Sequence, residues 1–325
     1  MAREREQIVV NAITNPYALV EARYGTMLAN RFDTYIGQAL IQYGEYGEHE
    51  LDLPRQYITH PGTVVEVGAN IGSQTVALAQ AARAVGGDLV AFEPQPFLFQ
   101  NLCANLALNG IDNAIAWPFA VSAQAGSVAF GAPDYRQPGN FGSVSMREQG
   151  NVGDVIVPSV RLDDVLAGRQ VRLIKIDVEG FEMQVLRGAA ALITSCRPVI
   201  YIENDRPAQS QALIEYLWRR GYRLWWHVTT LFNDRNHRQR ADNVYQGFYS
   251  YNMICLPFES QVTPEDLPEV TDSGAHPGLK THEPETLPEM QAAIDMPTPS
   301  LDGVTLEHSN LVGSVCAEER SLEPV

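Results

Sequence analysis

The chain has 325 residues, of which 45% are hydrophobic, and it carries a net charge of −16. These values allow a large buried core in one α/β domain with extensions, and the acidic balance argues against a nucleic-acid partner. No run approaches ~18 apolar residues, so no membrane span is expected. The charged N-terminus lacks an apolar signal core, which predicts a cytoplasmic protein.

The composition divides the chain into three parts. Residues 1–60 are predicted to form an N-terminal helical extension whose aromatic segment 24–46 covers the ligand site as a lid, and residues 61–258 form the main domain. Residues 259–325 hold 14 acidic and two basic residues, repeated prolines and no aromatic residue. Such a segment cannot bury enough apolar surface to offset its loss of conformational entropy. We therefore expect an acidic tail that is mostly disordered.

The first strand of the main domain ends in the sequence VVEVGANIG, residues 64–72. An apolar strand followed by a glycine turn and a helix is how a Rossmann-like fold opens its ligand site. Asn70 occupies the position at which a dinucleotide loop needs glycine, and Glu66 would repel a pyrophosphate. A ligand with an ammonium and a sulfonium group fits better, so Glu66, Gly68, Asn70 and Gly72 are predicted to bind S-adenosylmethionine. Glycines that serve only the turn geometry are the alternative.

A second acidic residue follows the next predicted strand. A helix over 73–84 leads to a strand over 88–92, which runs into Glu93 and Pro94. An acid at the end of the second strand of a βαβ unit accepts hydrogen bonds from ribose hydroxyls. Glu93 is therefore a predicted cofactor ligand, although a solvated acid before a helix N-terminus would give the same pattern.

The pattern continues with a helix over 96–109 and a third strand over 114–121, which would place Ser122 at its carboxyl end as a further cofactor residue. Residues 123–160 are rich in glycine and proline and are too long for a plain connection. They read as a functional insertion with a hairpin, in which Asn140 is the best candidate for a polar contact with substrate.

The fourth strand, over 173–176, delivers Asp177 and Glu179 to the same edge of the sheet. These two acids are candidate catalytic groups, and Lys175 could tune them or orient the substrate. Helix capping by Asp177 is the alternative. Strands over 198–204, 222–228 and 247–257 bring the predicted sheet to seven strands with helices on both faces. His227 ends the sixth strand and could reach the substrate, although a partly buried histidine is the simpler interpretation.

Three blocks together, VVEVGANIG, AFEP and IKIDVEGFEMQVLRG, resemble the FkbM-like family of S-adenosylmethionine-dependent methyltransferases. The resemblance covers about residues 33–257, and the IDVEG block is its most specific part. It implies a seven-stranded Rossmann-like fold that methylates hydroxyl groups of saccharides or secondary metabolites. It also implies that Glu66, Gly68, Asn70 and Glu93 line the cofactor and that Asp177 and Glu179 face the reaction centre. Ser73 and Gln74 depart from the expected pattern.

Other classes remain open. A nucleic-acid amino-methyltransferase would carry an N/D-P-P-Y/F motif after the fourth strand, where this chain has Asp177-Val178-Glu179-Gly180. A small-molecule N-methyltransferase and a catalytically silent binding module of the same fold are further alternatives, and the turn chemistry disfavours an NAD oxidoreductase. The cysteines show no metal-type spacing and no third ligand accompanies the two acids, so no metal site is assigned, and a metal bound by the two acids stays an open alternative.

Overall fold

The computed structural model describes residues 15–279 of the chain. The greater part of the acidic tail lies outside the described residues, and so do residues 301–311, for which the sequence predicts a short element. Within 15–279, the model contains no helix that combines the length and the apolar character needed to cross a membrane.

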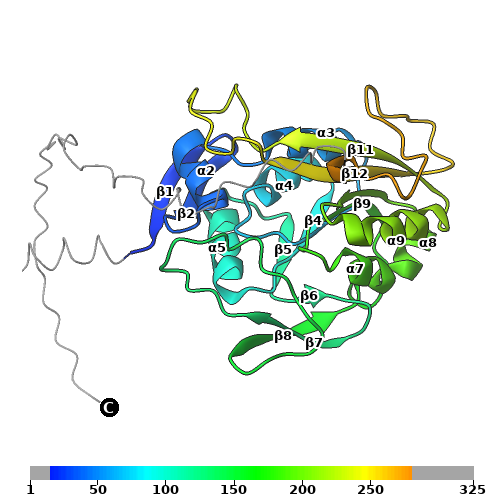
Figure 1. The fold of residues 1–325 in the computed structure, drawn as a ribbon, viewed down its shortest axis with the longest axis horizontal. Coiled ribbons are helices and arrows are strands. Elements are labelled where there is room, and N and C mark those ends of the chain that lie inside the picture. The colour runs from blue at the N-terminus through cyan, green and yellow to red at the C-terminus, as the bar shows by residue number, and fades with distance from the viewer. Residues whose placement is uncertain (1–14, 280–325) are drawn as a thin grey trace, which may run out of the picture. The chain divides into compact units, whose positions relative to one another are not determined.

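A seven-stranded sheet forms the centre of the domain (Figure 1). From one edge to the other its strands are β11 (Tyr222–Thr230), β12 (Tyr249–Pro257), β10 (Val199–Glu203), β9 (Val171–Ile176), β3 (Thr63–Val67), β4 (Asp88–Phe92) and β5 (Ala114–Trp117). All neighbours run parallel except β12, which is antiparallel to both β10 and β11. The predicted α/β fold with a seven-stranded sheet is thus confirmed. Its order reverses between β3 and β9, which is where ligands bind in open parallel sheets.

Helices cover both faces of this sheet, as alternate residues of the central strand β3 show. Val64 belongs to a core with α4 (Thr75–Ala84) and α5 (Pro96–Leu108). Val65 and Val67 pack with α7 (Glu182–Gly188), α8 (Ala190–Cys196) and α9 (Pro207–Trp218) on the other face. All five residues of β3 are buried, as expected of a central parallel strand. The only charged residue among them is Glu66.

The segment predicted as one strand over 114–121 is two strands in different sheets, so that prediction was wrong. β5 ends at Trp117, Pro118 lacks the N–H that would continue the ladder, and β6 (Ala120–Val121) joins a second, three-stranded sheet. The other members of that sheet are β7 (Gly126–Gly131) and β8 (Asp154–Val160), which pair antiparallel and confirm the predicted hairpin in the insertion. A short helix, α6 (Leu162–Val165), leads from it to β9.

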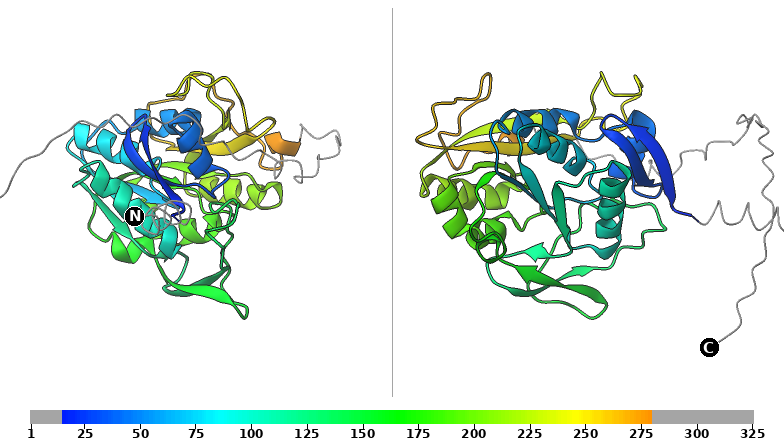
Figure 2. Two further views of the ribbon diagram at one scale, coloured as in Figure 1. Left: turned by 90° about the vertical axis from the view of Figure 1, so that its left-hand side faces the viewer. Right: turned by 180° about the vertical axis from the view of Figure 1, so that it is seen from behind.

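The N-terminal extension begins with a β-hairpin, β1 (Tyr17–Ala22) and β2 (Gly25–Asn30), where helical structure was expected. Two helices follow, α2 (Ile36–Tyr43) and α3 (Glu48–Gln56). Asn105 of α5 fixes the hairpin, because its side chain accepts a hydrogen bond from the Leu28 N–H at 2.6 Å. Figure 2 shows the hairpin and α2 beside α5 in two further views. The extension therefore packs on the domain next to the ligand edge.

Part of the segment expected to be disordered is ordered. Residues 259–279 continue from β12 and end in a 3₁₀ turn, η1 (Pro277–Leu279). The Val270 N–H donates to the Leu224 carbonyl at 2.8 Å and the Trp226 N–H donates to the Pro268 carbonyl at 3.0 Å, so this segment lies along β11. His276 is buried beside Trp226. For these residues the prediction of disorder is corrected, because local hydrogen bonds and one buried imidazole fix a chain that has few apolar groups.

Candidate active site

A pocket opens at the point where the strand order reverses. Its described lining comes from the N-terminal extension, the turns after β3, β4 and β9, and the insertion; it consists of Ile36, Tyr46, Gly68, Asn70, Glu93, Pro94, Gln95, Phe130, Asn140, Gly142, Val144, Met146, Asp177, Val178 and Glu179. The space between these residues is about 700 Å³ with its open side included.

The turn after β3 approaches the end of β9 closely enough to require glycine. The Asp177 N–H donates to the Val67 carbonyl at 3.0 Å. A Cβ at Gly68 would lie 1.8 Å from the Asp177 carbonyl oxygen, and the residue has φ +89. Asn70 also has a positive φ of 50, which asparagine tolerates better than most residues. The sequence therefore places Gly68, Asn70 and Asp177 on one wall of the pocket.

Glu93 is held rigidly at the end of β4 and lines the pocket. Its two carboxylate oxygens accept hydrogen bonds from the N–H groups of Asn70 and Gln95, each at 2.8 Å. Burial raises the pKa of Glu93 to about 7, although these two N–H donors favour the charged form. An ionised carboxylate has about four acceptor positions, so Glu93 keeps capacity for hydroxyl groups of a ligand.

Glu66 and Lys175 lie side by side on β3 and β9, and both are outside the pocket lining. The Lys175 ammonium is 3.2 Å from Asp177 and 3.6 Å from Glu50 of α3. Burial opposes its charge, but the carboxylates of Asp177, Glu50 and Glu66 outweigh burial and raise the pKa of Lys175. Burial also raises the pKa of Glu66 to about 7, and Lys175 only partly offsets this. Glu66 and Lys175 are therefore buried ionisable groups that lie outside the pocket lining and interact electrostatically with Asp177 within it.

Asp177 and Glu179, the two predicted catalytic acids, both line the pocket. Together with Glu203 they each offer one carboxylate oxygen within 4.8 Å of the others. Arg206 bonds Glu179 at 2.8 Å and lies 3.9 Å from Glu203, so a guanidinium already supplies positive charge to two of the three acids. Burial and the charge of Asp177 raise the pKa of Glu179 to about 7 despite Arg206.

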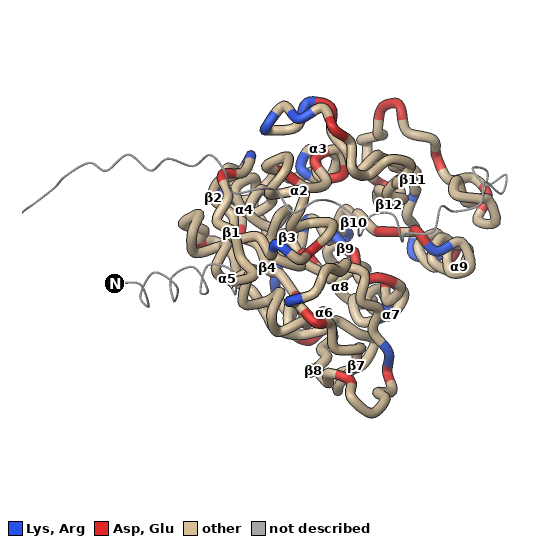
Figure 3. Tube along the Cα trace, turned by 60° about the vertical axis from the view of Figure 1, so that its left-hand side comes forward, with Lys and Arg blue, Asp and Glu red and all other residues tan. Residues whose placement is uncertain are grey.

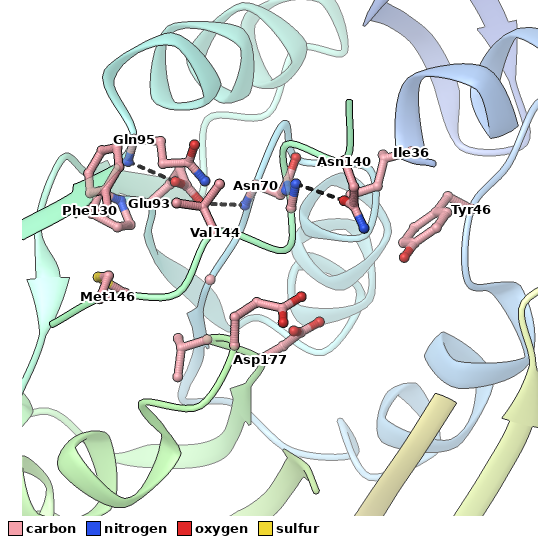
Figure 4. Close-up of a pocket in the computed structure, with 15 residues that line it drawn as sticks. Ile36, Tyr46, Asn70, Glu93, Gln95, Phe130, Asn140, Val144, Met146 and Asp177 are labelled. Atoms are coloured by element: carbon pink, nitrogen blue, oxygen red, sulfur yellow. Dashed lines mark hydrogen bonds between the residues drawn. The ribbon is translucent and has the colours of Figure 1, made fainter. Parts of the chain in front are cut away.

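Asn140 lies in the part of the insertion that covers the pocket. Its side chain accepts hydrogen bonds from the N–H groups of Gly142 and Ser143, which shapes a tight turn above Asn70 (Figure 4). Gln95 fixes this covering loop, because its side-chain amide donates to the Phe141 carbonyl at 2.9 Å. The Tyr135 hydroxyl of the same loop donates to the side-chain amide oxygen of Gln95 at 2.8 Å. The insertion is thereby tied to the residue that follows Glu93.

Besides Glu66 and Lys175, three further predicted site residues lie outside the pocket lining. Gly72 has φ +84 and packs against Leu102, which lets α4 meet α5. Ser122 follows β6 in the second sheet, because β5 ends at Trp117, and its carbonyl oxygen faces Gly188 of α7. His227 on β11 shares a 2.8 Å hydrogen bond with the buried Tyr201 hydroxyl, and burial lowers the pKa of His227 to about 4.

Several pocket residues were not singled out from the sequence. Tyr46 comes from the loop between α2 and α3. Its sequence signals were its place in the aromatic segment 24–46 and in the block Tyr43-Gly44-Glu45-Tyr46, which is similar to a secondary feature of the FkbM-like family. Phe130, Val144 and Met146 of the insertion form an apolar part of the pocket (Figure 4). Gln95 directly follows the EP dipeptide and could have been found from that spacing. Val144 directly follows Asn140-Phe141-Gly142-Ser143, a block that is similar to another secondary feature of that family, whereas Phe130 and Met146 carry no recognisable motif.

The arrangement fits a ligand with positive charge. The described lining holds Glu93, Asp177 and Glu179 and contains no Lys, Arg or His. Glu66 Oε2 is buried without a hydrogen-bond partner among residues 15–279. Across the described chain, Lys and Arg are mostly interspersed with Asp and Glu (Figure 3), but Arg235, Arg238 and Arg240 share the loop between β11 and β12. S-adenosylmethionine has a sulfonium and an ammonium group, which this acidic pocket would stabilise, and hydroxyls suited to Glu93.

The sequence is similar to known methyltransferases. Residues 66–224 match the methyltransferase FkbM domain. A hexuronic acid methyltransferase, AglP, of Haloferax volcanii is 25% identical over 138 residues, which are 42% of this chain and 53% of that protein. Methyltransferase 1 of Beauveria bassiana is 28% identical over 196 residues, covering 53% of this chain and 76% of that protein. The chain thus spans about half the length of the Haloferax relative.

Among solved structures, an FkbM methyltransferase from Methylobacillus flagellatus is 16% identical with a TM-score of 0.41, over 60% of this chain and 43% of that chain. A tRNA methyltransferase-like protein of Streptococcus pneumoniae, solved with S-adenosylmethionine, is 10% identical with a TM-score of 0.39, over 66% of this chain and 74% of that chain. Residues 66–224 form a methyltransferase domain of the FkbM family, whose cofactor is S-adenosylmethionine.

Proposed function

We propose that this protein transfers a methyl group from S-adenosylmethionine to a hydroxyl group of a saccharide or a related secondary metabolite. The observation that carries the proposal is the position of Asp177. Its side chain is 34% exposed, lines the pocket beside Glu179 and lies 3.2 Å from the buried Lys175 ammonium. A carboxylate at this point of the sheet can accept the proton that a hydroxyl loses during methylation.

The residues around Glu93 would hold the cofactor. Its carboxylate, fixed by two backbone N–H groups, would accept hydrogen bonds from the ribose hydroxyls. Charged hydrogen bonds of this kind contribute about 1.5–3 kcal/mol each. Phe130, Val144 and Met146 offer an apolar surface on which the adenine ring can pack. The turn of Gly68 and Asn70 would then face the methionine part.

The proposed reaction is an in-line displacement. S-adenosylmethionine supplies a methyl group on a positively charged sulfur, which leaves with the bonding electron pair. Asp177, with Glu179 beside it, orients the acceptor hydroxyl and takes its proton as the oxygen–carbon bond forms. Lys175 and Arg206 hold these two carboxylates in place. Orientation can supply up to ~7–11 kcal/mol of the barrier and a positioned base about 10²–10⁴-fold in rate.

The relative from Haloferax, named a hexuronic acid methyltransferase, supports a saccharide acceptor. Transfer to nitrogen in nucleic acid is the main alternative. It lacks support from the charge of the pocket, because the described lining holds three acidic residues and no Lys, Arg or His. A catalytically silent binding protein of the same fold would leave Asp177 and Glu179 without a chemical role.

The test is methyl transfer from S-adenosylmethionine labelled on the methyl group. Purified protein is incubated with carbohydrate, nucleic-acid and protein fractions of a cell extract, and the label in each is counted. The proposal expects label in carbohydrate or small alcohols that survives mild base, as an ether does. Asp177→Asn should lose this label, while Asp164→Asn, an exposed acid on α6, should keep it. Label in nucleic acid or in no fraction would contradict the proposal.

A further inference from the structure

Figure 4 shows that the pocket runs from Phe130, Val144 and Met146 at one end to Tyr46 and Ile36 at the other. The first end holds these three apolar side chains and Glu93, and the adenosine part of the cofactor fits there by its chemistry. Tyr46 lies at the other end, beyond Asn70, and Asp177 projects between the two. The end at Tyr46 is therefore the part of the pocket that remains for the methyl acceptor.

The hydroxyl group of Tyr46 makes no hydrogen bond within the described chain. Its loop is held between Gly44 and Gly47, whose φ values of 70 and 63 favour glycine. The phenol oxygen has no hydrogen-bond partner among residues 15–279, although the ring lines the pocket. Burial raises the pKa of Tyr46 well above its usual value, so the group stays neutral and can both donate and accept. A hydroxyl in such a position is suited to a ligand.

The charges at this end are one-sided. Asp177 and Glu179 face the pocket, and the two cations that contact them are already shared with other acids. Lys175 also contacts Glu50 at 3.6 Å, and Arg206 also contacts Asp205 at 3.0 Å. An acceptor carboxylate, sulfate or phosphate placed here would meet two carboxylates, and the described lining offers it no Lys, Arg or His. Like charges placed next to each other repel, so this end of the pocket would discriminate strongly against an anionic ligand.

We propose that Tyr46, Asp177 and Glu179 form the acceptor site and that it takes a sugar with no anionic group beside the reacting hydroxyl. This inference rests on the proposed function and narrows it. The face of the Tyr46 ring packs against the sugar ring, and its hydroxyl bonds a neighbouring sugar hydroxyl. Asp177 then receives the proton of the reacting hydroxyl. Uronic acids, which the name of the Haloferax relative specifies, are excluded from this site.

The charge selectivity is tested with two acceptor pools. Extract glycans are separated by anion exchange into a neutral and an acidic pool, matched in hexose content, and each is incubated with the full-length protein and methyl-labelled S-adenosylmethionine. The expected result is at least about tenfold more base-stable label in the neutral pool, which corresponds to ~1.4 kcal/mol of discrimination. Base-stable label mainly in the acidic pool overturns this inference and leaves hydroxyl methylation standing. Label in neither pool overturns both proposals.

The role of Tyr46 is tested by removing only its hydroxyl. Tyr46→Phe should lower kcat/KM for the labelled pool by about tenfold, chiefly through KM, and keep the affinity for S-adenosylhomocysteine within about twofold. Tyr57→Phe, which removes a phenol outside the pocket lining, is the matched control and should change neither. An unchanged kcat/KM in Tyr46→Phe, or a tenfold loss of S-adenosylhomocysteine affinity, would overturn the assignment of Tyr46 to the acceptor.

Discussion

The ammonium of Lys175 lies 3.2 Å from the carboxylate of Asp177 and is 2% exposed. On its other side, 3.6 Å away, is Glu50 of α3, so a helix of the N-terminal extension takes part in the charge balance behind the pocket. A buried cation with acids on two sides holds a fixed position, because any displacement leaves one carboxylate unpaired. Lys175 thereby orients Asp177, whose side chain is 34% exposed and lines the pocket.

If Asp177 receives the proton of the acceptor, Asp177→Asn should reduce turnover by about 10²–10⁴-fold, because an amide cannot act as a base. Affinity for S-adenosylhomocysteine should stay within a few-fold, and Glu179→Gln should behave similarly to a lesser degree. Calorimetry and labelled transfer measure the two quantities separately. Loss of cofactor affinity in Asp177→Asn would place this acid against the cofactor.

Glu93 is expected to account for much of the cofactor affinity. Glu93→Ala should weaken S-adenosylhomocysteine binding about tenfold or more, because it removes charged hydrogen bonds to the ribose. Asp88→Asn, at the opposite end of the same strand, is the control and should bind normally. Unchanged affinity in a folded Glu93→Ala protein, measured by calorimetry, would rule out this role.

The buried Glu66 predicts an unusual pH dependence of stability. Its pKa is about 7 in the folded protein and 4.5 for an ordinary glutamate, so the folded state binds the proton more tightly. The resulting stabilisation is fully present below about pH 4.5 and is lost as the pH rises through about 7. Glu66→Gln cannot ionise, so its melting temperature without cofactor should fall less than that of the natural protein between about pH 5 and about pH 7.5. If the melting temperatures of the two proteins change equally with pH, Glu66 is ionised in the folded protein throughout this range.

Gly68 and Gly86 form a matched pair for backbone effects. Both have positive φ, but a Cβ at Gly68 would lie 1.8 Å from the Asp177 carbonyl oxygen, whereas a Cβ at Gly86 would meet nothing within 4 Å. Gly86→Ala should therefore cost only the backbone strain, about 1–2 kcal/mol. Gly68→Ala should lower the melting temperature clearly further and abolish cofactor binding. Equal losses in thermal unfolding would mean that the turn can move away from β9.

Truncation should distinguish the two parts of the acidic segment. Removal of residues 280–325 should leave the melting temperature nearly unchanged, because their sequence contains no aromatic residue. Removal of everything after Ser260 should lower it by several degrees, since the buried His276 donates a 2.7 Å hydrogen bond to the Asn204 carbonyl at the end of β10. Scanning calorimetry measures the melting temperatures of the two truncated proteins. Equal values would contradict the packing of residues 259–279 on β11.

The features that the sequence by itself determined are those with local causes. A run of apolar residues ending in VGAN gives a buried strand and a glycine turn, and EP after the next strand ends it at the acid. These local patterns placed Gly68, Asn70, Glu93, Asp177 and Glu179 at the carboxyl edge of one sheet, because parallel strands all end there. All five line the pocket.

Only the tertiary structure decided which distant segments complete that edge. Tyr46 and Glu50 arrive from the N-terminal extension and Arg206 from the turn before α9, and no local pattern fixes the partner of such a residue. Ser122 was misplaced for a related reason: Pro118 ends β5, and β6 finds its partner in β8 of the insertion. Long-range packing of this kind depends on the shapes of assembled surfaces, which the order of residues along one element does not encode.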